Sequence, residues 1–527
     1  MITTADSPGL TPNIDRGFVA TLVDRLHTSG AGGSTPVVSP FDESEFTVVP
    51  IASDADVLAA VDRARRAQLE WAQRSPADRK RVLSTFHDLL IDNADLAMDL
   101  VQLESGKARI PAFEEIYDTI ATTHYYLKVG SGLLRTRRRA VSLPGFTTAY
   151  ELRHPVGVVG CITPWNFPFT LSMSDMIPAL LAGNGVVIKP DEKTPLSALY
   201  GARLLEEAGV PPDLVQVVTG PGDVIGPTLI GAVDFIMFTG STEVGRVVAE
   251  QAGRRLIGSS MELGGKNSAI VFADADLDKT VPGIARAVFA NGGQLCTAME
   301  RIHVDESIRA EFTERFVEHT RGLVMTPGFD FSSALSSMIT REHLENVDAH
   351  VQDAVANGAT LLTGGKTRPD IGPLFYEPTV LTDVDDSMDI CRSETFGPVV
   401  TIYGFESVED AVREANASDF GLNFSVWTED TRRGIDVASR LQAGTVGVND
   451  GYAAAWSSYD APMGGMKASG QGRRHGSEGL LKFTEAQTIA VQKIGPAFAP
   501  IAGLGYETYH RLLGKALKLL KRMPFYK

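Results

Sequence analysis

The feature that most restricts the fold is a change of pattern near residue 156, where short runs of β-branched residues begin to alternate with stretches of helical periodicity. Such alternation is typical of a parallel sheet flanked by helices. The sequence therefore predicts an α/β fold. The first strands are expected at residues 156–163, 186–189, 215–219 and 235–238.

A second series of strands and helices begins near residue 268, with strands expected at residues 268–272, 302–305, 399–405, 424–427 and 446–449. The chain has 527 residues and a mass of 56.6 kDa, which exceeds the size of one ordinary hydrophobic core. We therefore expect two or three domains. Before the first sheet, Ser53 and Ser75 are each expected to cap a helix, the second with Pro76 in its tolerant first turn.

Charge and cysteine content narrow the class of protein. The net charge of −16 at pH 7 argues against general binding to nucleic-acid phosphates. No apolar run is long enough to cross a bilayer and no cleavable leader begins the chain, so we expect a cytoplasmic protein. Cys161, Cys296 and Cys391 form no CxxC pair and no ligand spacing, so neither a disulfide framework nor a metal site is predicted.

Cys296 ends the stretch FANGGQLC at residues 289–296, behind small and amide residues that could leave backbone N–H groups free to meet a substrate. A thiol in such a setting is a candidate nucleophile, because the lack of bulk at Gly292 and Gly293 allows close approach. The alternative for a single cysteine is a buried structural residue. Three other stretches decide between the two, namely PWNFP at 164–168, MELGGK at 261–266 and ETFGPV at 394–399.

These four stretches, in this order and spacing, closely resemble the aldehyde dehydrogenase superfamily, from about residue 40 to about residue 495. Within it, the chain is most similar to actinobacterial enzymes assigned as succinate-semialdehyde dehydrogenases. The resemblance implies a Rossmann-type cofactor domain, an α/β catalytic domain and a small oligomerisation sheet. The corresponding ranges are 20–143 with 157–264, then 265–465, and the strands within 144–156 and 484–495. A homo-oligomer, either a dimer or a tetramer, follows from the same resemblance.

The resemblance also implies NAD(P)-dependent oxidation of an aldehyde to a carboxylic acid through a cysteine thiohemiacetal and a thioester. Cys296 would be the nucleophile, and the amide of Asn166 would stabilise the developing oxyanion together with the Cys296 N–H. Glu262 would activate the water that hydrolyses the thioester. A CoA-acylating enzyme is disfavoured because this base is present, and an idle structural protein because all three groups are present.

Cofactor contacts are expected where loops follow the strands of the first sheet. Glu192 would accept the ribose hydroxyls of NAD and repel the 2′-phosphate of NADP, which favours NAD, whereas Lys189 could pair with that phosphate, so NADP stays open. Glu394 would hold the nicotinamide ribose with Phe396 beside the ring. The other expected cofactor residues are Thr163, Pro164, Trp165, Gly222, Gly226, Phe238, Gly240, Ser241, Gly245 and Leu263.

The expected substrate site differs from the substrate sites of related enzymes. Well-known succinate-semialdehyde dehydrogenases place two arginines where this chain has Ser174 and Ala290, and neither residue can replace a bidentate guanidinium. Ser458, with Ser457, does match the serine pair of that subfamily. Two substrate classes therefore stay open: succinate semialdehyde held in another way, or a less polar aldehyde in a site with apolar walls, used by a broad-specificity, medium- or long-chain or aromatic aldehyde dehydrogenase.

The tail over residues 496–527 is predicted to contain a basic amphipathic helix from residue 508, with leucines on one face and Lys and Arg on the other. Such a helix can dock on the acidic body or on a neighbouring subunit, which we favour, or lie on an anionic membrane as a peripheral contact.

Overall fold

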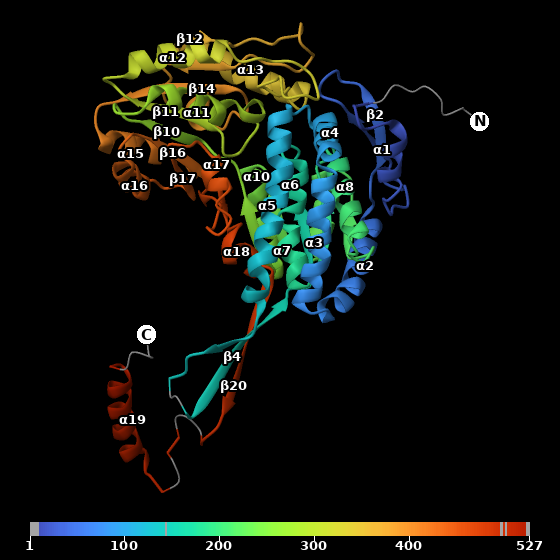
Figure 1. Cartoon of the computed structure of the whole chain (residues 1–527), viewed down its shortest axis with the longest axis vertical. Helices are drawn as coiled ribbons and strands as arrows, with labels where there is room; N and C mark the ends of the chain where they lie inside the picture. The colour runs from blue at the N-terminus through green and yellow to red at the C-terminus, as the bar shows by residue number, and fades with distance from the viewer. Residues whose placement is uncertain (1–9, 143–144, 496–498, 501–502, 523–527) are drawn as a thin grey trace, which may run out of the picture.

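The computed structural model describes residues 10–142, 145–495, 499–500 and 503–522. Its first sheet has six strands in the order β19-β9-β8-β5-β6-β7, all parallel except β19, which runs antiparallel to β9 (Figure 1). The predicted α/β architecture is confirmed. The strands are β5 (Val158–Ile162), β6 (Gly185–Lys189), β7 (Val215–Val217), β8 (Phe235–Thr239), β9 (Gly258–Glu262) and β19 (Gly470–Gln471).

Helices cover both faces of this sheet, because alternate strand residues point to opposite sides and both sets are apolar. Val158, Val187 and Ile236 pack with α2, α9 and α10, whereas Val159 and Met237 pack against the other helices. The helices are α2 (Asp54–Gln73), α3 (Pro76–Asp92), α4 (Ala94–Ser105), α5 (Arg109–Leu134), α6 (Pro168–Met173), α7 (Met176–Ala182), α8 (Pro195–Glu207), α9 (Gly222–Ala232) and α10 (Thr242–Arg255).

Both predicted helix caps are confirmed. Ser53 accepts from the N–H of Asp56, whose carboxylate accepts from the Ser53 N–H in return, which completes a capping box at the start of α2. Ser75 accepts from the N–H of Asp78 at the start of α3, where Pro76 occupies the first turn. Local capping chemistry therefore sets where these two helices begin.

The second sheet has seven strands in the order β12-β13-β14-β11-β10-β16-β17, parallel except for β12. Helices α11 (Leu277–Phe289) and α12 (Arg309–Arg321) pack on one face, and α15 (Val408–Asn416) and α16 (Thr431–Arg440) on the other. The strands are β10 (Asn267–Val271), β11 (Met299–Asp305), β12 (Thr360–Thr363), β13 (Thr379–Thr382), β14 (Val399–Phe405), β16 (Asn423–Trp427) and β17 (Thr445–Val448).

Several further helices and strands complete the fold and were not predicted. They are the helices α1 (Arg16–Val23), α13 (Arg341–Ala356), α14 (Asp389–Arg392), α17 (Ala453–Trp456) and α18 (Gly476–Leu481), and the paired strands β1 (Ser34–Val38) with β2 (Glu45–Pro50) and β15 (Phe420–Gly421) with β18 (Met466–Lys467).

The small sheet projects from the body as an arm (Figure 1). Strands β4 (Thr147–Pro155) and β20 (Thr484–Gln492) pair antiparallel over their whole length, as the two predicted strands should. A third strand, β3 (Arg137–Arg139), joins β4, so this segment belongs to the arm and not to the first sheet, within whose predicted range it falls. Tyr150, Ile489 and Val491 lie exposed on the arm.

The predicted tail helix is confirmed as α19 (Tyr506–Leu520), which lies apart from both large sheets (Figure 1). Within the described residues 503–522, only Tyr509 is buried, so the helix does not dock on the body of its own subunit. Residues 496–498, 501–502 and 523–527 of the predicted tail, and residues 143–144 at the edge of two predicted ranges, lie outside the described residues. None of the helices in the described part of the chain combines the length and the apolarity that a bilayer crossing requires.

Candidate active site

A cavity of about 270 Å³ lies where the carboxyl ends of β5, β8 and β9 meet the second sheet. β5 lies between β6 and β8, so the strand order reverses at this point, and such a switch point is where open parallel sheets bind ligands. We call it the first cavity. Its lining comprises Pro164, Trp165, Asn166, Thr239, Gly240, Ser241, Glu262, Leu263, Gly264, Cys296, Glu394 and Phe396.

Ten of these twelve residues are ones that the sequence predicted, and all three expected catalytic residues are among them. Thr239 and Gly264 are the two that it missed, although Gly264 is part of MELGGK and Thr239 lies between the predicted residues Phe238 and Gly240. The structure therefore brings together five stretches that are up to 232 residues apart, from Pro164 to Phe396.

Cys296 follows a turn that ordinary side chains rarely adopt. In η1 (Ala290–Gly293) the residues 291–293 have φ of 51°, 64° and 73°, the left-handed region that glycine tolerates best. A Cβ on Gly293 would lie 1.9 Å from the carbonyl oxygen of Gly397. The turn thus presses the cysteine segment against the loop that follows Glu394, which explains the absence of bulk in the motif.

The Cys296 thiol is half-buried and sits in an acidic environment. Burial, Glu394 and Glu262 together raise its pKa to about 12, while the cation of Arg474 and the thiol's own backbone N–H act in the opposite direction. The neutral thiol is therefore the resting form in the free protein, and burial contributes most to keeping it neutral.

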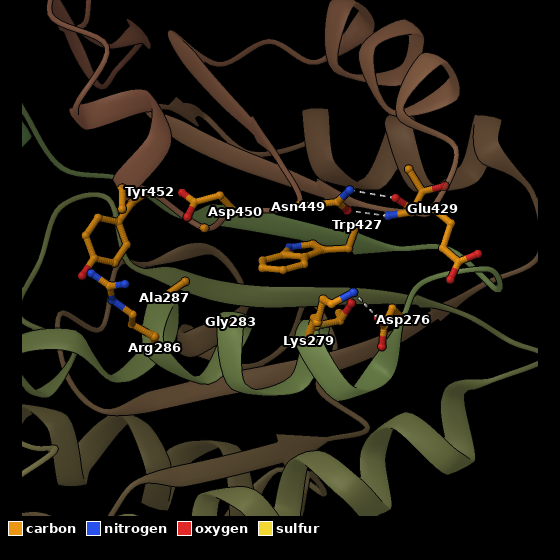
Figure 2. Close-up of a pocket in the computed structure, with 14 residues that line it drawn as sticks. Asp276, Lys279, Gly283, Arg286, Ala287, Trp427, Glu429, Asn449, Asp450 and Tyr452 are labelled. Carbon is orange, nitrogen blue, oxygen red and sulfur yellow. Dashed lines mark hydrogen bonds and ion pairs between the residues drawn. The ribbon is translucent and has the colours of Figure 1, made fainter.

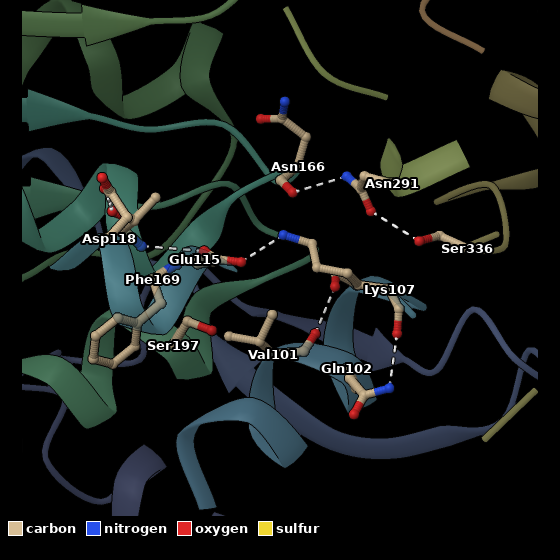
Figure 3. A network of polar contacts seen from close by, with 12 residues as sticks. Val101, Gln102, Lys107, Glu115, Asp118, Asn166, Phe169, Ser197, Asn291 and Ser336 are labelled. Atoms are coloured by element: carbon tan, nitrogen blue, oxygen red, sulfur yellow. Dashed lines mark hydrogen bonds and ion pairs between the residues drawn. The ribbon is translucent and has the colours of Figure 1, made fainter. Parts of the chain in front are cut away.

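Asn166 is held with part of its amide available. Its Nδ2 donates to the backbone oxygen of Gln294 at 3.0 Å, and the backbone oxygen of Asn166 accepts from the Asn291 side-chain amide at 3.1 Å (Figure 3). The second N–H of the amide remains for a ligand. The Oδ1 atom is buried and has no partner among the described residues. A catalytic role is one physical reason for such an unsatisfied buried atom.

Glu262 ends β9 and is buried, with one carboxyl oxygen lacking any partner among the described residues. Burial is the main cause that raises its pKa to about 7, aided by Asp175 and opposed by the cations of Arg474 and Lys482. A carboxyl group with this pKa exchanges protons readily at neutral pH, which suits a general base.

A buried ion pair holds the loop that carries Glu394 and Phe396. Glu300 pairs with Lys266 and accepts the N–H groups of Thr395 and Phe396 at 3.0 Å. Burial and Glu300 raise the pKa of Glu394 to about 8, although its Oε1 accepts the Gly265 N–H at 2.8 Å. The loop is therefore oriented from the second sheet.

Another buried pair supports the Asn166 segment from the opposite side. Lys107 and Glu115 are fully buried and joined by a hydrogen bond (Figure 3). The other oxygen of Glu115 accepts the N–H groups of Phe169 and Thr170 at the start of α6, at 2.6 and 3.1 Å. The pair thus supplies an acceptor for the free backbone N–H groups in the first turn of α6, the helix that begins at the last residue of PWNFP.

Replacing Lys107 with methionine should lower the free energy of unfolding by about 3–5 kcal/mol, because Glu115 loses its counter-charge while buried. The double variant Lys107→Met with Glu115→Gln should recover most of that loss, since the amide can still accept from α6 and no charge remains. Urea denaturation followed by tryptophan fluorescence measures both variants. A double variant as unstable as the single one would contradict this account of the pair.

The remaining cofactor residues predicted from the sequence do not line the first cavity. Lys189, at the end of β6, is buried, and a Cβ on Gly222 at the start of α9 would lie 3.8 Å from its Nζ. A Cβ on Gly226 would meet nothing within 4 Å. Gly222 is therefore exposed beside the buried ammonium group of Lys189, while Gly226 is buried one helical turn further on with space around its Cα.

Four further predicted cofactor residues are described by their packing and hydrogen bonds within the protein. The N–H of Thr163 donates to Lys189 O at 3.1 Å. Gly245 allows contact between α10 and Leu263, since a Cβ there would lie 2.3 Å from a Leu263 methyl group. Phe238 is buried in β8 beside Gly240, and Glu192 is half-buried in the loop after β6.

A second cavity, of about 340 Å³, lies on the other side of the Cys296 segment. Leu295 and Phe167 line it, whereas their chain neighbours Cys296 and Asn166 line the first cavity, so the two cavities flank the same two segments. The other lining residues are Glu114, Glu115, Tyr117, Asp118, Ala121, Arg286, Tyr452, Ala453, Trp456, Ser457 and Tyr459.

None of the three predicted substrate residues lines this second cavity. Ser174 is buried and donates to Asp118 at 3.2 Å. Ala290 is half-buried against the core of the second sheet. Ser458 is exposed and donates to Ala454 O at 2.7 Å, while its neighbour Ser457 lines the cavity.

Sequence reasoning missed four residues that hold the site together. Asn267 donates to the carbonyl oxygens of Cys296 and Ala298 at 2.8 Å, and Lys266 and Glu300 orient the loop described above. Arg474 pairs with Asp175 in a buried position and sets the charge around Glu262. Only Lys266, as the last residue of MELGGK, carried a signal in the sequence.

Comparison with known proteins gives relatives over almost the whole chain. A protein of Mycolicibacterium smegmatis named "Putative succinate-semialdehyde dehydrogenase", for NADP(+), is 48% identical over 93% of this chain and 95% of the relative. Human retinal dehydrogenase 2 is 37% identical over 92% of this chain and 94% of its own.

Solved structures show the same fold. Betaine aldehyde dehydrogenase from Staphylococcus aureus, in complex with NAD+, matches with a TM-score of 0.84 and 31% identity over 88% of this chain and 92% of that chain. An NADP-dependent enzyme of E. coli also matches with a TM-score of 0.84, at 32% identity over 88% of this chain and 95% of that chain. The model of the aldehyde dehydrogenase family matches residues 27–489, and the chain therefore belongs to that family.

Proposed function

We propose that Cys296 gives its thiol proton to water, attacks the aldehyde carbonyl carbon as a thiolate and forms a thiohemiacetal, and that it carries the acyl group as a thioester once this carbon has lost a hydride. The observation that supports this is the meeting of Cys296, Asn166 and Glu262 in the first cavity. The free N–H of the Asn166 amide and the Cys296 N–H would stabilise the oxyanion, each contributing about 3 kcal/mol. Because the pKa of Glu394 is raised to about 8, this carboxyl is mostly neutral at pH 7, which lessens its repulsion of the thiolate.

Glu262 would complete the reaction as general base. In its ionised form it takes a proton from water, the hydroxyl oxygen adds to the thioester carbon, and loss of the Cys296 thiol releases the carboxylic acid. Its unpartnered buried oxygen supports this role, since no described residue competes for the proton.

The residues around the first cavity fit a nicotinamide dinucleotide, which when bound accepts the hydride that leaves the substrate carbon. The exposed Gly222 beside Lys189, and the space at Gly226, would admit the adenosine end, held by Lys189 and Glu192. The turn between β8 and α10, and Leu263, would contact the middle of the molecule, and Glu394 and Phe396 its nicotinamide end. The full set is Thr163, Pro164, Trp165, Lys189, Glu192, Gly222, Gly226, Phe238, Gly240, Ser241, Gly245, Leu263, Glu394 and Phe396.

We propose succinate semialdehyde as the substrate. The names of the mycobacterial relatives support it, and the second cavity contains one arginine, Arg286. A second candidate is an uncharged aldehyde, which is favoured by the walls formed by Phe167, Leu295 and Trp456 and by the lack of a cation at Ser174 and Ala290.

A panel of succinate semialdehyde, butanal and benzaldehyde, each with NAD and with NADP, tests this proposal. We expect the highest kcat/KM with succinate semialdehyde and free acid as the product with or without CoA. For the cofactor, Glu192 supports NAD and the names of the relatives support NADP, so turnover with both is expected. A higher kcat/KM for butanal than for succinate semialdehyde would favour the second candidate.

The turnover number kcat should also increase with pH. Because Glu262 acts only when ionised and burial raises its pKa to about 7, kcat should rise as pH increases through about 7 and level off above about 8. The measurement is kcat with saturating aldehyde and cofactor between about pH 5.5 and about pH 8.5. A kcat that falls across this range would argue against Glu262 as base.

We also propose that the arm forms the contact between subunits of a homo-oligomer, a dimer or a tetramer. Tyr150, Ile489 and Val491 support this, because apolar side chains exposed on a projecting strand pair are candidates for burial by a partner. The basic helix α19 would then contact a neighbouring subunit, with an anionic membrane as the alternative.

A further inference from the structure

The acidic residues of the second cavity are already satisfied by the protein itself. Asp118 accepts from Tyr459 at 3.0 Å, from Thr170 at 2.5 Å, from Ser174 and from the indole N–H of Trp456. The neighbouring Glu115 is paired with Lys107. A buried carboxylate with several donors is fixed in place and does not need a ligand.

Arg286 is the only Lys or Arg among the described residues that line this cavity. It lies on α11, four residues before Ala290, the residue at which that helix ends. Arg286 lines the second cavity, whereas Ala290 does not. This cavity therefore has a cation even though Ser174 and Ala290 carry none.

The Arg286 guanidinium is held in position but remains accessible. It pairs with Glu114 and lies 5.7 Å from the ring centroid of Tyr452, against whose face it rests (Figure 2). The Tyr452 hydroxyl donates to the other Glu114 oxygen at 2.9 Å. The Arg286 side chain is nevertheless 56% exposed, and a guanidinium has five N–H donors, of which a single carboxylate can use two.

We propose that Arg286 binds the carboxylate of a short aldehyde acid at the outer end of the second cavity, an inference that rests on the proposed function. The aldehyde group would point past Leu295 toward Cys296, and the carboxylate would share the guanidinium with Glu114. Arg286 is thus a residue that determines specificity. Glu114 weakens the binding of the substrate to Arg286, because both carboxylates compete for the same guanidinium.

The test compares succinate semialdehyde with butanal, which has the same four-carbon chain without the carboxylate. Arg286→Gln should lower kcat/KM for succinate semialdehyde by about 10- to 100-fold, mainly through KM, and leave butanal within about twofold. Arg286→Lys should restore part of the loss, since a point charge lacks the bidentate fork. Glu114→Gln should lower KM for succinate semialdehyde, because a competing carboxylate is removed.

Lys279→Gln is the matched control, since it removes a positive charge from the same helix at a position outside this cavity and should change neither substrate. Equal losses on both substrates in Arg286→Gln, or changes in the same direction for Arg286→Gln and Glu114→Gln, would show a structural role and overturn the assignment. If the wild type oxidises butanal but not succinate semialdehyde, the proposed substrate itself fails, and this inference fails with it.

Discussion

Replacing Cys296 with alanine should lower the rate of aldehyde oxidation by at least about ten-thousand-fold, because the acyl group then has no nucleophile to carry it. Binding of the cofactor should be unchanged, since no predicted contact at Lys189, Glu192 or Glu394 is altered. Removing a half-buried sulfur beside small residues should also leave the fold intact.

Reduced-cofactor absorbance measures the rate, and fluorescence titration measures cofactor binding. Cys391→Ala is the matched control, because this half-buried cysteine is not among the residues that line either cavity and should keep full activity. Activity of Cys296→Ala near that of the wild type would require another nucleophile and would remove the basis of the proposed mechanism.

Replacing Glu262 with glutamine should lower steady-state turnover by about 100- to 10,000-fold, because an amide cannot take a proton from the attacking water. Hydride transfer precedes this step and should be much less affected. The substitution also removes one of the two carboxylates that raise the pKa of the Cys296 thiol, so formation of the thiohemiacetal should not become slower.

Rapid mixing of this variant with aldehyde and oxidised cofactor should therefore give a burst of about one reduced cofactor per active subunit, followed by slow turnover. The wild type, mixed under the same conditions, provides the comparison. If the variant shows no burst and its first turnover is as slow as the later ones, Glu262 acts before hydride transfer and is not primarily the base for hydrolysis.

Strands β6 and β8 could be predicted because their own composition requires burial. Every residue of β6 and β8 is buried, and both appear in the sequence as short apolar runs. In contrast, β9 reads Gly-Ser-Ser-Met-Glu, and it is a strand because β8 offers it a parallel partner. The three arginines of β3 likewise carry no strand pattern of their own and pair only because β4 lies beside them.

Within the site, the sequence predicts residues that lie inside local motifs and misses those that act from a distance. Glu300 orients the loop of Glu394 by accepting the N–H of Thr395, 95 residues away, and Arg474 pairs with Asp175 across 299 residues. The substrate residues show the same limit. The Ser174 hydroxyl is bound to Asp118, 56 residues earlier, and this contact could not be inferred from any local pattern.

The most direct test of the mechanism is mass spectrometry of the Glu262→Gln variant after it has been mixed with succinate semialdehyde and oxidised cofactor and quenched in acid. A thioester that is hydrolysed slowly should survive, so the peptide containing Cys296 should gain the mass of one succinyl group. Peptides containing Cys161 or Cys391 should gain none, and Cys296→Ala should remain unmodified. An acyl group on any other residue, or full turnover with no acyl group on Cys296, would contradict the proposed covalent mechanism.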